Sequence, residues 1–340
     1  MLGTLYAQVA LARRRIYRRE GRQRWLQRPV VSVGNLRVGG TGKTPTVAHV
    51  ARLLLDMGER PSILSRGYAR PTVIDGVVVV SDGRRVRADL AASGDEPLML
   101  ARSVPGARVL VSADRYLAGR LAETHLAATV HLLDDGFQHL PLARGTDLVI
   151  VGLEDVADPR TLPMGRLREP LGSAAAAAAL LVPDASDDQA AALAERLNVA
   201  TAFRLMREAG APMRLDLFGP SARVASRGPV YALAGVARPA RFFEELQASG
   251  WTIVGTAPFP DHRRYTTGDL AALVAAARSA GATALITTEK DVMRLLSFRP
   301  LPLPLIWVPL DVRIEPAPAF RRWLSDRLVN ERSAGRGAQA

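Results

Sequence analysis

The chain of 340 residues contains no cysteine. This absence excludes disulfide bonds, metal sites built on thiolates and cysteine nucleophiles, and it agrees with a reducing compartment. No stretch approaches the roughly 20 apolar residues that a membrane-spanning helix needs, so the sequence predicts no integral membrane span. Apolar and charged residues make up 48% and 23% of the chain, as is ordinary for a globular protein. The length allows two domains with a substantial core.

Lysine is almost as scarce, because it occurs only at positions 43 and 290 among 45 basic residues. Lys43 lies in the segment Val30–Pro45, which reads VVSVGNLRVGGTGKTP. Its apolar part predicts a buried strand, its glycines let backbone N–H groups surround a phosphate, and Thr44 begins a helix whose positive end faces the anion. A compact ammonium fits beside the β- and γ-phosphates better than a planar guanidinium does. The segment therefore predicts a nucleotide-phosphate site.

The phosphate-binding motif is incomplete, because Arg37 stands where the full Walker pattern has its first glycine. The alternative is a glycine-rich turn that happens to end in Gly-Lys-Thr. The strand before it and the amphipathic run Val47–Met57 after it favour the phosphate site. The residues predicted to bind the nucleotide are Arg37, Val38, Gly39, Gly40, Thr41, Gly42, Lys43 and Thr44.

The net charge of +12 is concentrated at the N-terminus, where residues 1–28 hold eight arginines and one glutamate. About a dozen mostly apolar residues precede these arginines, which reverses the order found in a signal peptide. We expect residues 1–28 to form a basic amphipathic segment that lies in a membrane interface, with arginines against anionic headgroups. One alternative is a basic helix packed on the folded domain. Another is a nucleic-acid arm, although no recognition motif accompanies the charge.

Strand-like and helix-like segments alternate along the chain, which predicts an α/β fold with a mostly parallel sheet. Residues 29–215 are predicted to form a P-loop NTPase-like domain. Proline and glycine suggest a linker around residues 211–227, and the alternation resumes in a smaller α/β domain assigned to residues 216–330. Residues 331–340 offer no apolar side chain for packing and are predicted to be a disordered tail.

Two pairs of adjacent carboxylates are candidates for chemistry. Asp134 and Asp135 follow an apolar strand, where an acidic residue can hold Mg²⁺ or its waters opposite the hydroxyl of Thr44. The alternative is a pair of turn-forming, helix-capping aspartates. Asp95 and Glu96 precede a predicted helix and serve either as its N-terminal cap or as a general base and metal ligand.

Three further groups bear on phosphoryl transfer. His262 follows Asp261, and a carboxylate paired with an imidazole is a suitable base for an alcohol, although a lone histidine is more often structural. Arg166 and Arg168 are candidates for a phosphate clamp, with an arginine-rich loop as the alternative. Lys290 lies one place too late for the N-K-x-D motif of a GTPase and by itself indicates a structural ion pair.

Taken together, these segments resemble one family, tetraacyldisaccharide 4′-kinase, the lipid A 4′-kinase of Gram-negative bacteria. Each motif is weak alone, but their order and spacing from Val33 to Asp291 are highly specific. The matching segments are VGNLRVGGTGKTP, LSRGY, GDEP, Asp114-Arg115, DDGFQH, LREP, LAGVARP, PDH and TEKD.

The resemblance implies ATP-dependent, Mg²⁺-assisted phosphoryl transfer to the 4′-hydroxyl of a lipid A disaccharide 1-phosphate. It also implies a peripheral or monotopic enzyme at the cytoplasmic face of the bacterial inner membrane, with no nucleic-acid partner. Family members often carry a longer apolar N-terminus than this chain. By the same resemblance Asp95 is the base and His262 its partner, and Arg168 contacts phosphate, while Lys290 receives no role. The implied catalytic and metal-site residues are Asp95, His262, Lys43 and Arg168, and Thr44, Glu96, Asp134 and Asp135.

Two other classes share some of these features. Partitioning-type P-loop ATPases share the sequence GGTGKT, but they carry a lysine directly before the glycine pair, where this chain has Val38. A basic nucleic-acid-binding protein would spread arginines and aromatic residues over one face. Aromatic residues are only 5% of this chain, and its charge is concentrated in residues 1–28.

Overall fold

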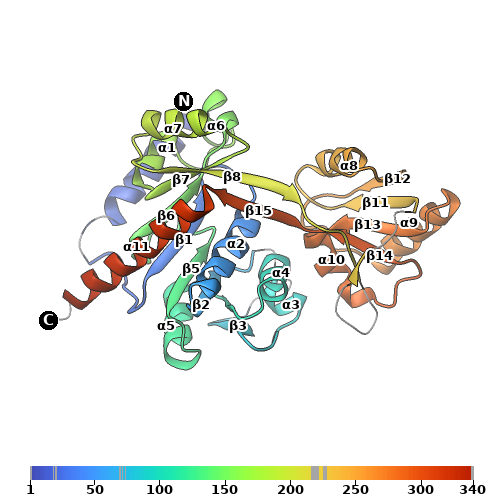
Figure 1. Ribbon diagram of the computed structural model, residues 1–340, viewed down its shortest axis with the longest axis horizontal. Helices are drawn as coiled ribbons and strands as arrows, with labels where there is room; N and C mark the ends of the chain where they lie inside the picture. Colours follow the sequence, from blue (N-terminus) through green and yellow to red (C-terminus); the bar gives the residue numbers. More distant parts are fainter. Residues whose placement is uncertain are drawn as a thin grey trace.

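The computed structural model describes residues 2–17, 19, 21–68, 70, 72, 74–215, 222–224 and 228–337. The chain forms two α/β units, each built on its own sheet, and two extended segments connect them (Figure 1). The first sheet has nine strands and the second has six. The predicted fold class, a P-loop-type domain with a mostly parallel sheet followed by a smaller α/β unit, is confirmed.

The first sheet is parallel except at its edges. Its strand order is β15-β8-β7-β6-β1-β5-β2-β4-β3, and only the edge strands β15 and β3 run antiparallel to their neighbours. Strand β1 lies at the centre, so the loop that follows it opens in the middle of the carboxyl edge. The strands are β1 (Val30–Asn35), β2 (Pro61–Ser65), β3 (Val78–Asp82), β4 (Arg108–Val111), β5 (Val130–Asp134), β6 (Thr146–Ile150), β7 (Ala179–Pro183), β8 (Ala202–Ala209) and β15 (Leu310–Glu315).

Helices cover both faces of this sheet. Because successive side chains of a strand point to opposite faces, Val31 of β1 packs with α2 (Lys43–Asp56) and α11 (Ala317–Gly337), whereas Val30 packs with α5 (Arg115–His125). The first unit is therefore a three-layer sandwich. Its remaining helices are α1 (Leu2–Tyr17), α3 (Leu90–Ser93), α4 (Asp95–Ser103), α6 (Leu153–Ala157), α7 (Asp187–Arg196) and a 3₁₀ turn at Leu171–Ala176.

The second sheet has the order β10-β9-β14-β13-β11-β12, with four parallel strands from β14 to β12. Its strands are β9 (Met213–Arg214), β10 (Ala222–Arg223), β11 (Val230–Ala234), β12 (Ile253–Pro258), β13 (Ala284–Thr288) and β14 (Leu305–Val308). Its helices are α8 (Pro239–Ala248), α9 (Thr267–Ser279), α10 (Glu289–Leu295) and a 3₁₀ turn at Leu296–Phe298. Leu98 and Met99 of α4 share a buried cluster with Val292 and Met293 of α10, so the two units pack directly on each other.

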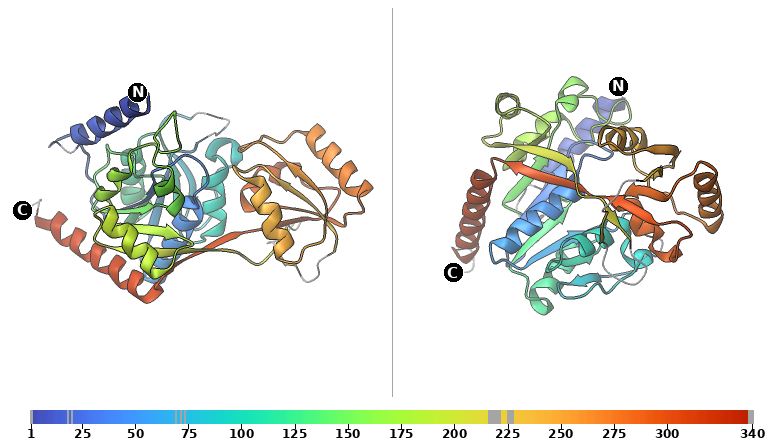
Figure 2. Two further views of the ribbon diagram at one scale, coloured as in Figure 1. Left: turned by 90° about the horizontal axis from the view of Figure 1, so that it is seen from above. Right: turned by 45° about the vertical axis from the view of Figure 1, so that its right-hand side comes forward.

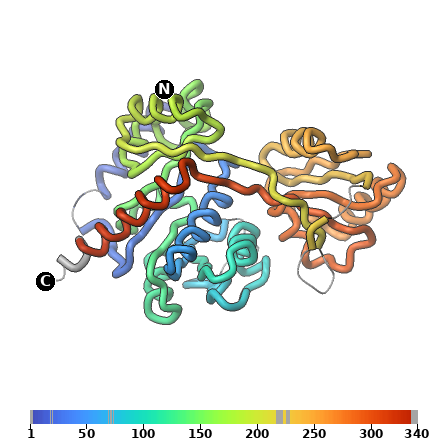
Figure 3. Tube along the Cα trace, in the orientation of Figure 1, coloured from blue at the N-terminus to red at the C-terminus, as the bar shows by residue number. Residues whose placement is uncertain are grey.

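The chain returns to the first unit at its C-terminus, as the tube in Figure 3 makes clear. Strand β15 pairs with β8, and α11 packs on the first sheet, although the sequence pattern assigned residues 216–330 to the second unit. The predicted disordered tail is also corrected, because α11 continues to Gly337 and Thr146 donates a hydrogen bond to Glu331 at 2.6 Å. Residues 338–340, and residues 216–221 and 225–227 of the expected linker, lie outside the described residues.

Helix α1 lies on the outside of the first unit, on a different side from α11 (Figure 2). The hydroxyl of Thr161 donates to the carbonyl of Gly3 at 2.8 Å, and Arg14 is buried at the other end of the helix. Of the alternatives for residues 1–28, packing on the folded domain is thus observed for α1. Among the described helices, none combines the length and the apolar character needed to cross a membrane.

Candidate active site between the two units

The loop between β1 and α2 has the conformation of a phosphate-binding loop. Gly39 and Gly42 adopt positive φ angles of 100° and 85°, which residues with a side chain rarely adopt. The amide of Asn35 donates to the hydroxyl of Thr41 at 2.8 Å and fixes the loop from inside. Lys43 reaches back to the Asn35 side-chain oxygen at 3.3 Å, and Thr44 is buried in the first helical turn. The loop is therefore fixed at the N-terminus of α2, where a helix dipole favours an anion.

The two aspartates after β5 lie beside this loop. Asp135 is 3.6 Å from the ammonium of Lys43 and accepts a hydrogen bond from Arg168 at 2.8 Å. Asp134 ends β5, is buried, and accepts a hydrogen bond from Ser65 at the end of β2 at 3.2 Å. Because β1, β5 and β2 are adjacent parallel strands, their carboxyl ends bring these side chains to one edge of the sheet.

The electrostatics of the two aspartates differ. Burial, reinforced by the negative charges of Glu96 and Asp135, raises the pKa of Asp134 to about 7. Burial also opposes ionisation of Asp135, but Lys43 and Arg168 outweigh it and lower its pKa. The negative charges of Glu96 and Asp135 thus act on Asp134 at short range, as in a group of carboxylates around one site. No ready-made cluster of three or more metal-ligating residues is present in the described part of the chain.

The second unit brings His262 to Asp95. Asp95 is buried at the start of α4, and His262, with a positive φ of 58°, places Nδ1 3.2 Å from Asp95 Oδ2. Burial alone would raise the pKa of Asp95, but His262, Lys290 and Arg294 together hold it well below the usual range of an aspartate. Asp95 is therefore ionised at neutral pH, as a proton acceptor must be.

Lys290 lies in the same cluster, on α10 of the second unit. Its ammonium is 3.1 Å from a carboxylate oxygen of Glu96, 3.4 Å from Asp261 and 3.1 Å from His262 Nε2. Burial lowers the pKa of Lys290, but Glu96, Asp95 and Asp261 outweigh burial and raise it. The second lysine of the chain is thus charged and joins the two units at the site.

Arg294 and Asp291 belong to the site, although the sequence reasoning missed them. Arg294 lies one turn beyond Lys290 on α10 and donates to Asp95 through Nε at 2.8 Å and through Nη2. Its Nη1 donates to the carboxylate of Asp291 at 3.0 Å and to the carbonyl of Gly235 at 2.9 Å. The spacing of four residues between the two cations, which places them on one helix face, is the signal that could have found Arg294.

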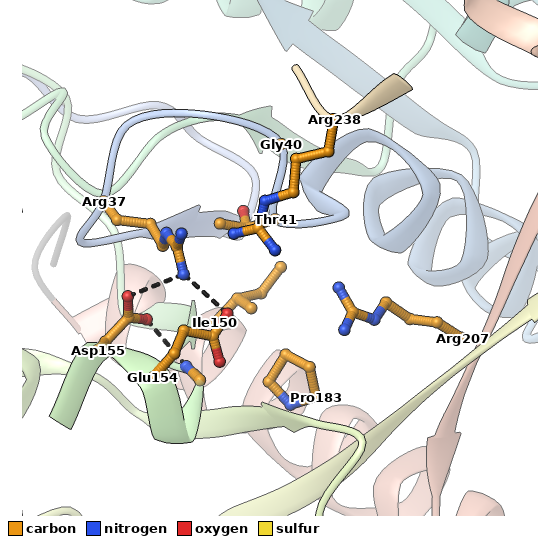
Figure 4. A pocket seen from close by; sticks show the side chains of 10 residues that line it. Arg37, Gly40, Thr41, Ile150, Glu154, Asp155, Pro183, Arg207 and Arg238 are labelled. Atoms are coloured by element: carbon orange, nitrogen blue, oxygen red, sulfur yellow. Dashed lines mark hydrogen bonds and ion pairs between the residues drawn. The ribbon is translucent and has the colours of Figure 1, made fainter. Parts of the chain in front are cut away.

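The side chain of Arg37 points away from the phosphate-binding loop. It lies 2.7 Å from Glu154 and 3.2 Å from Asp155, both in α6. These residues form one wall of a pocket beside the loop, with Arg207 facing them (Figure 4). The remaining lining residues are Gly40, Thr41, Ile150, Gly152, Pro183 and Arg238.

Comparisons with known proteins agree with this arrangement. A family model described as tetraacyldisaccharide-1-P 4'-kinase matches residues 1–329. The tetraacyldisaccharide 4'-kinase of Desulfotalea psychrophila is 38% identical over 308 residues, which is 87% of each chain. The protein of the same name from Bradyrhizobium diazoefficiens is 38% identical over 315 residues, 91% of this chain and 87% of the relative.

A solved structure is also similar over its full length. The crystal structure of LpxK from Aquifex aeolicus in complex with ATP matches with a TM-score of 0.76 and 29% identity, covering 96% of this chain and 97% of that chain. The family model spans nearly the whole sequence, and the curated relatives exceed 30% identity over most of both chains. The chain therefore belongs to the tetraacyldisaccharide 4'-kinase family.

Proposed function

We propose that the chain is an ATP-dependent kinase that transfers the γ-phosphoryl group to the 4′-hydroxyl of a lipid A disaccharide 1-phosphate. Family membership supports the reaction. The observation that carries the assignment of the site is the meeting of two groups at the junction of the units. Lys43, Asp135 and Arg168 lie on the phosphate side, and the Asp95–His262 pair lies on the side of the second unit.

The phosphate-binding loop supplies the electrostatic part of the mechanism. Backbone N–H groups of Gly39 to Thr44 surround the β- and γ-phosphates, while Lys43 neutralises charge on them. Arg168 is held by Asp135 and lies partly exposed, so its remaining donors can reach a transferring phosphoryl group. These cations favour the transition state, in which negative charge spreads over the equatorial oxygens of the phosphoryl group.

The residues near the loop fit a magnesium ion. Asp135 Oδ1 is buried and accepts no hydrogen bond in the described structure, and Asp134 is crowded by two other carboxylates. Hard oxygen donors of this kind suit Mg²⁺. We propose that Thr44, Glu96, Asp134 and Asp135 hold the ion directly or through water, and the ion would neutralise the phosphate oxygens when bound.

Asp95 is the proposed base. As the 4′-oxygen attacks the γ-phosphorus and ADP leaves, the hydroxyl proton passes to the Asp95 carboxylate. His262, 3.2 Å away, orients this carboxylate and stabilises its charge. The test is Asp95→Ala, which should retain ATP affinity and lose turnover by roughly 10²–10⁴-fold. Asp158→Ala removes an exposed carboxylate and should turn over normally. Near-wild-type turnover of Asp95→Ala would contradict the assignment.

We propose that the pocket of Figure 4 marks the side of the phosphate-binding loop towards which the nucleoside half of ATP extends. Gly40 and Thr41 of the phosphate-binding loop form one side of the pocket, and residues at the ends of β6 and β7 form the floor. A nucleotide whose phosphates lie on the loop must extend towards one side of it, and this pocket lies directly beside the loop.

We also propose that α1 docks on the cytoplasmic face of the inner membrane. Leu5 and Val9, one turn apart, are 64% and 62% exposed, and Met164 beside Gly3 is 59% exposed. Exposed apolar side chains next to an arginine cluster are typical of an interfacial helix. Anionic vesicles should retain the full chain and release a variant that lacks residues 1–28.

A matched pair of substitutions tests the surface itself. Val9→Glu should lower retention on anionic vesicles, because it places a carboxylate on the proposed docking face. Val329→Glu is the control, since Val329 is 55% exposed on α11, on a different side of the unit (Figure 2). Equal retention of the two variants would contradict docking through α1.

A further inference from the structure

Arg14 differs from its neighbours in the N-terminal arginine cluster because it is buried. Arg14 is 8% exposed, whereas Arg13 and Arg15 on either side are exposed. A buried guanidinium loses its hydration, and this loss is compensated only when the group is paired and hydrogen-bonded. Its partners are therefore informative about what α1 does.

Those partners are two residues of the loops that carry the proposed active site. Arg14 donates through Nε and Nη2 to the carboxylate of Glu169, with the Nη2–Oε1 contact at 3.2 Å. Nη2 also donates to the carbonyl of Phe137 at 3.2 Å, and the guanidinium carbon lies 3.9 Å from the centroid of the Phe137 ring. Glu169 and Phe137 are themselves buried. Arg14 thus makes a forked ion pair and a cation–π contact in one place.

Each partner lies within two residues of a residue that binds phosphate or metal in the proposed mechanism. Glu169 directly follows Arg168, and Phe137 lies two residues after Asp135. Arg168 and Asp135 contact each other at 2.8 Å. From its position on α1, Arg14 therefore joins the same two chain segments that the Arg168–Asp135 pair joins at the site.

The turn at Asp135 depends on such support. Asp135 has a φ of 53°, a left-handed conformation that a non-glycine residue seldom adopts and keeps only when its surroundings fix it. The Phe137 carbonyl is held by Arg14 and by Arg144, the latter at 2.9 Å. The Phe137 side chain lies so close to Gly34 of β1 that an added Cβ there would be 2.5 Å from it.

We propose that Arg14 is a positioning residue, which connects the proposed membrane helix to the phosphoryl-transfer site by holding the Asp135–Phe137 turn against the Arg168–Glu169 segment. The proposal rests on the roles proposed above for Asp135 and Arg168. Helix α1 then has two separate functions on two faces: its exposed face meets lipid, and its buried face sets the geometry of the site. Substitutions on the two faces should have different effects.

The test compares Arg14→Gln with Arg15→Gln, which removes the same charge from the exposed side of the same helix. Turnover and ATP affinity are measured with the full chain, and retention on anionic vesicles is measured in parallel. Arg14→Gln should lower kcat by roughly 10–100-fold, the usual cost of losing a residue that orients the ligands of a site. Its retention on vesicles should stay within about twofold of that of Arg15→Gln. The ATP affinity of Arg15→Gln should match that of the wild type.

Arg14→Lys tests the geometry, because a lysine keeps the charge but loses the fork and the stacking. It should fold like the wild type and fall between the wild type and Arg14→Gln in kcat, and it carries the test if Arg14→Gln does not fold. Unchanged kcat in the Arg14 variants, or a loss confined to vesicle retention and to KM for the lipid, would overturn the proposal. A wild-type chain without kinase activity would instead contradict the proposed function.

Discussion

Replacing Arg294 by methionine should destabilise the protein more than the same substitution at an exposed arginine. The reason is that Arg294 neutralises two buried carboxylates across the junction of the units. Its side chain is 5% exposed, that of Asp95 is 6% and that of Asp291 is 0%. Methionine fills a similar volume without a charge. Breaking a buried ion pair from one side costs about 3–5 kcal/mol, since the remaining charge is left unpaired.

The contacts that survive place the cost at the lower end of that range. Asp291 keeps hydrogen bonds from the backbone of Gly235 and the hydroxyl of Tyr265, both at 2.9 Å. Asp95 still accepts a hydrogen bond from the backbone N–H of Glu96 at 2.9 Å, and His262 Nδ1 remains 3.2 Å from its carboxylate. We therefore expect Arg294→Met to lower the free energy of unfolding by about 3 kcal/mol.

Urea unfolding followed by tryptophan fluorescence measures this loss. The control is Arg241→Met, which breaks an exposed pair with Glu245 on α8 and should cost about 0.3–0.5 kcal/mol. Adding Asp95→Asn to Arg294→Met should recover part of the loss, because a neutral amide needs no counterion. The reasoning would be refuted if the decrease in the free energy of unfolding for Arg294→Met lay within about 1 kcal/mol of the decrease for Arg241→Met.

Three further predictions concern the charged groups of the site and its surroundings. Lys43→Ala should weaken ATP binding, measured by calorimetry, more than Lys290→Ala does, because only Lys43 lies in the phosphate-binding loop; equal losses would contradict this. Chelation of Mg²⁺ should abolish turnover, and readdition should restore it, whereas turnover in excess chelator would contradict the proposed metal role of Asp134 and Asp135. Burial raises the pKa of Glu289 to about 7 from 4.5, so the folded chain holds a proton there that the unfolded chain has lost, and stability falls as pH rises through this window. Glu289→Gln should therefore stabilise the fold at pH 8 and change little at pH 4, as urea midpoints would show; equal effects at both pH values would contradict the shift.

The parts of the fold that depend on local sequence could be predicted. The run before Lys43 forms β1, the glycines form the loop, and the alternation of strands and helices gives a mostly parallel sheet. Alternation does not reveal pairing partners, so the return of β15 to β8 and of α11 to the first sheet was not predicted. Glu331 illustrates the reason: its hydrogen bond to Thr146 joins residues far apart in the chain.

The candidate site was likewise predictable only in the part that local motifs mark. Motifs at strand ends indicated the residues of the first unit and their neighbourhood, because adjacent parallel strands end at one edge. Arg294 was missed because arginine is abundant throughout this chain and no motif marks it. Only the packing of α10 against α4 shows that Lys290 and Arg294 face the two carboxylates of the Asp95-Glu96 pair.

The most direct test of the central claim is the transfer reaction itself. The full chain is incubated with γ-labelled ATP, Mg²⁺ and lipid A disaccharide 1-phosphate, in parallel with the Asp95→Ala variant. We predict label on the 4′-oxygen of a bis-phosphorylated product, formed at least 100-fold more slowly by the variant despite equal ATP affinity. Label released only as inorganic phosphate, or equal rates for the two proteins, would contradict the account.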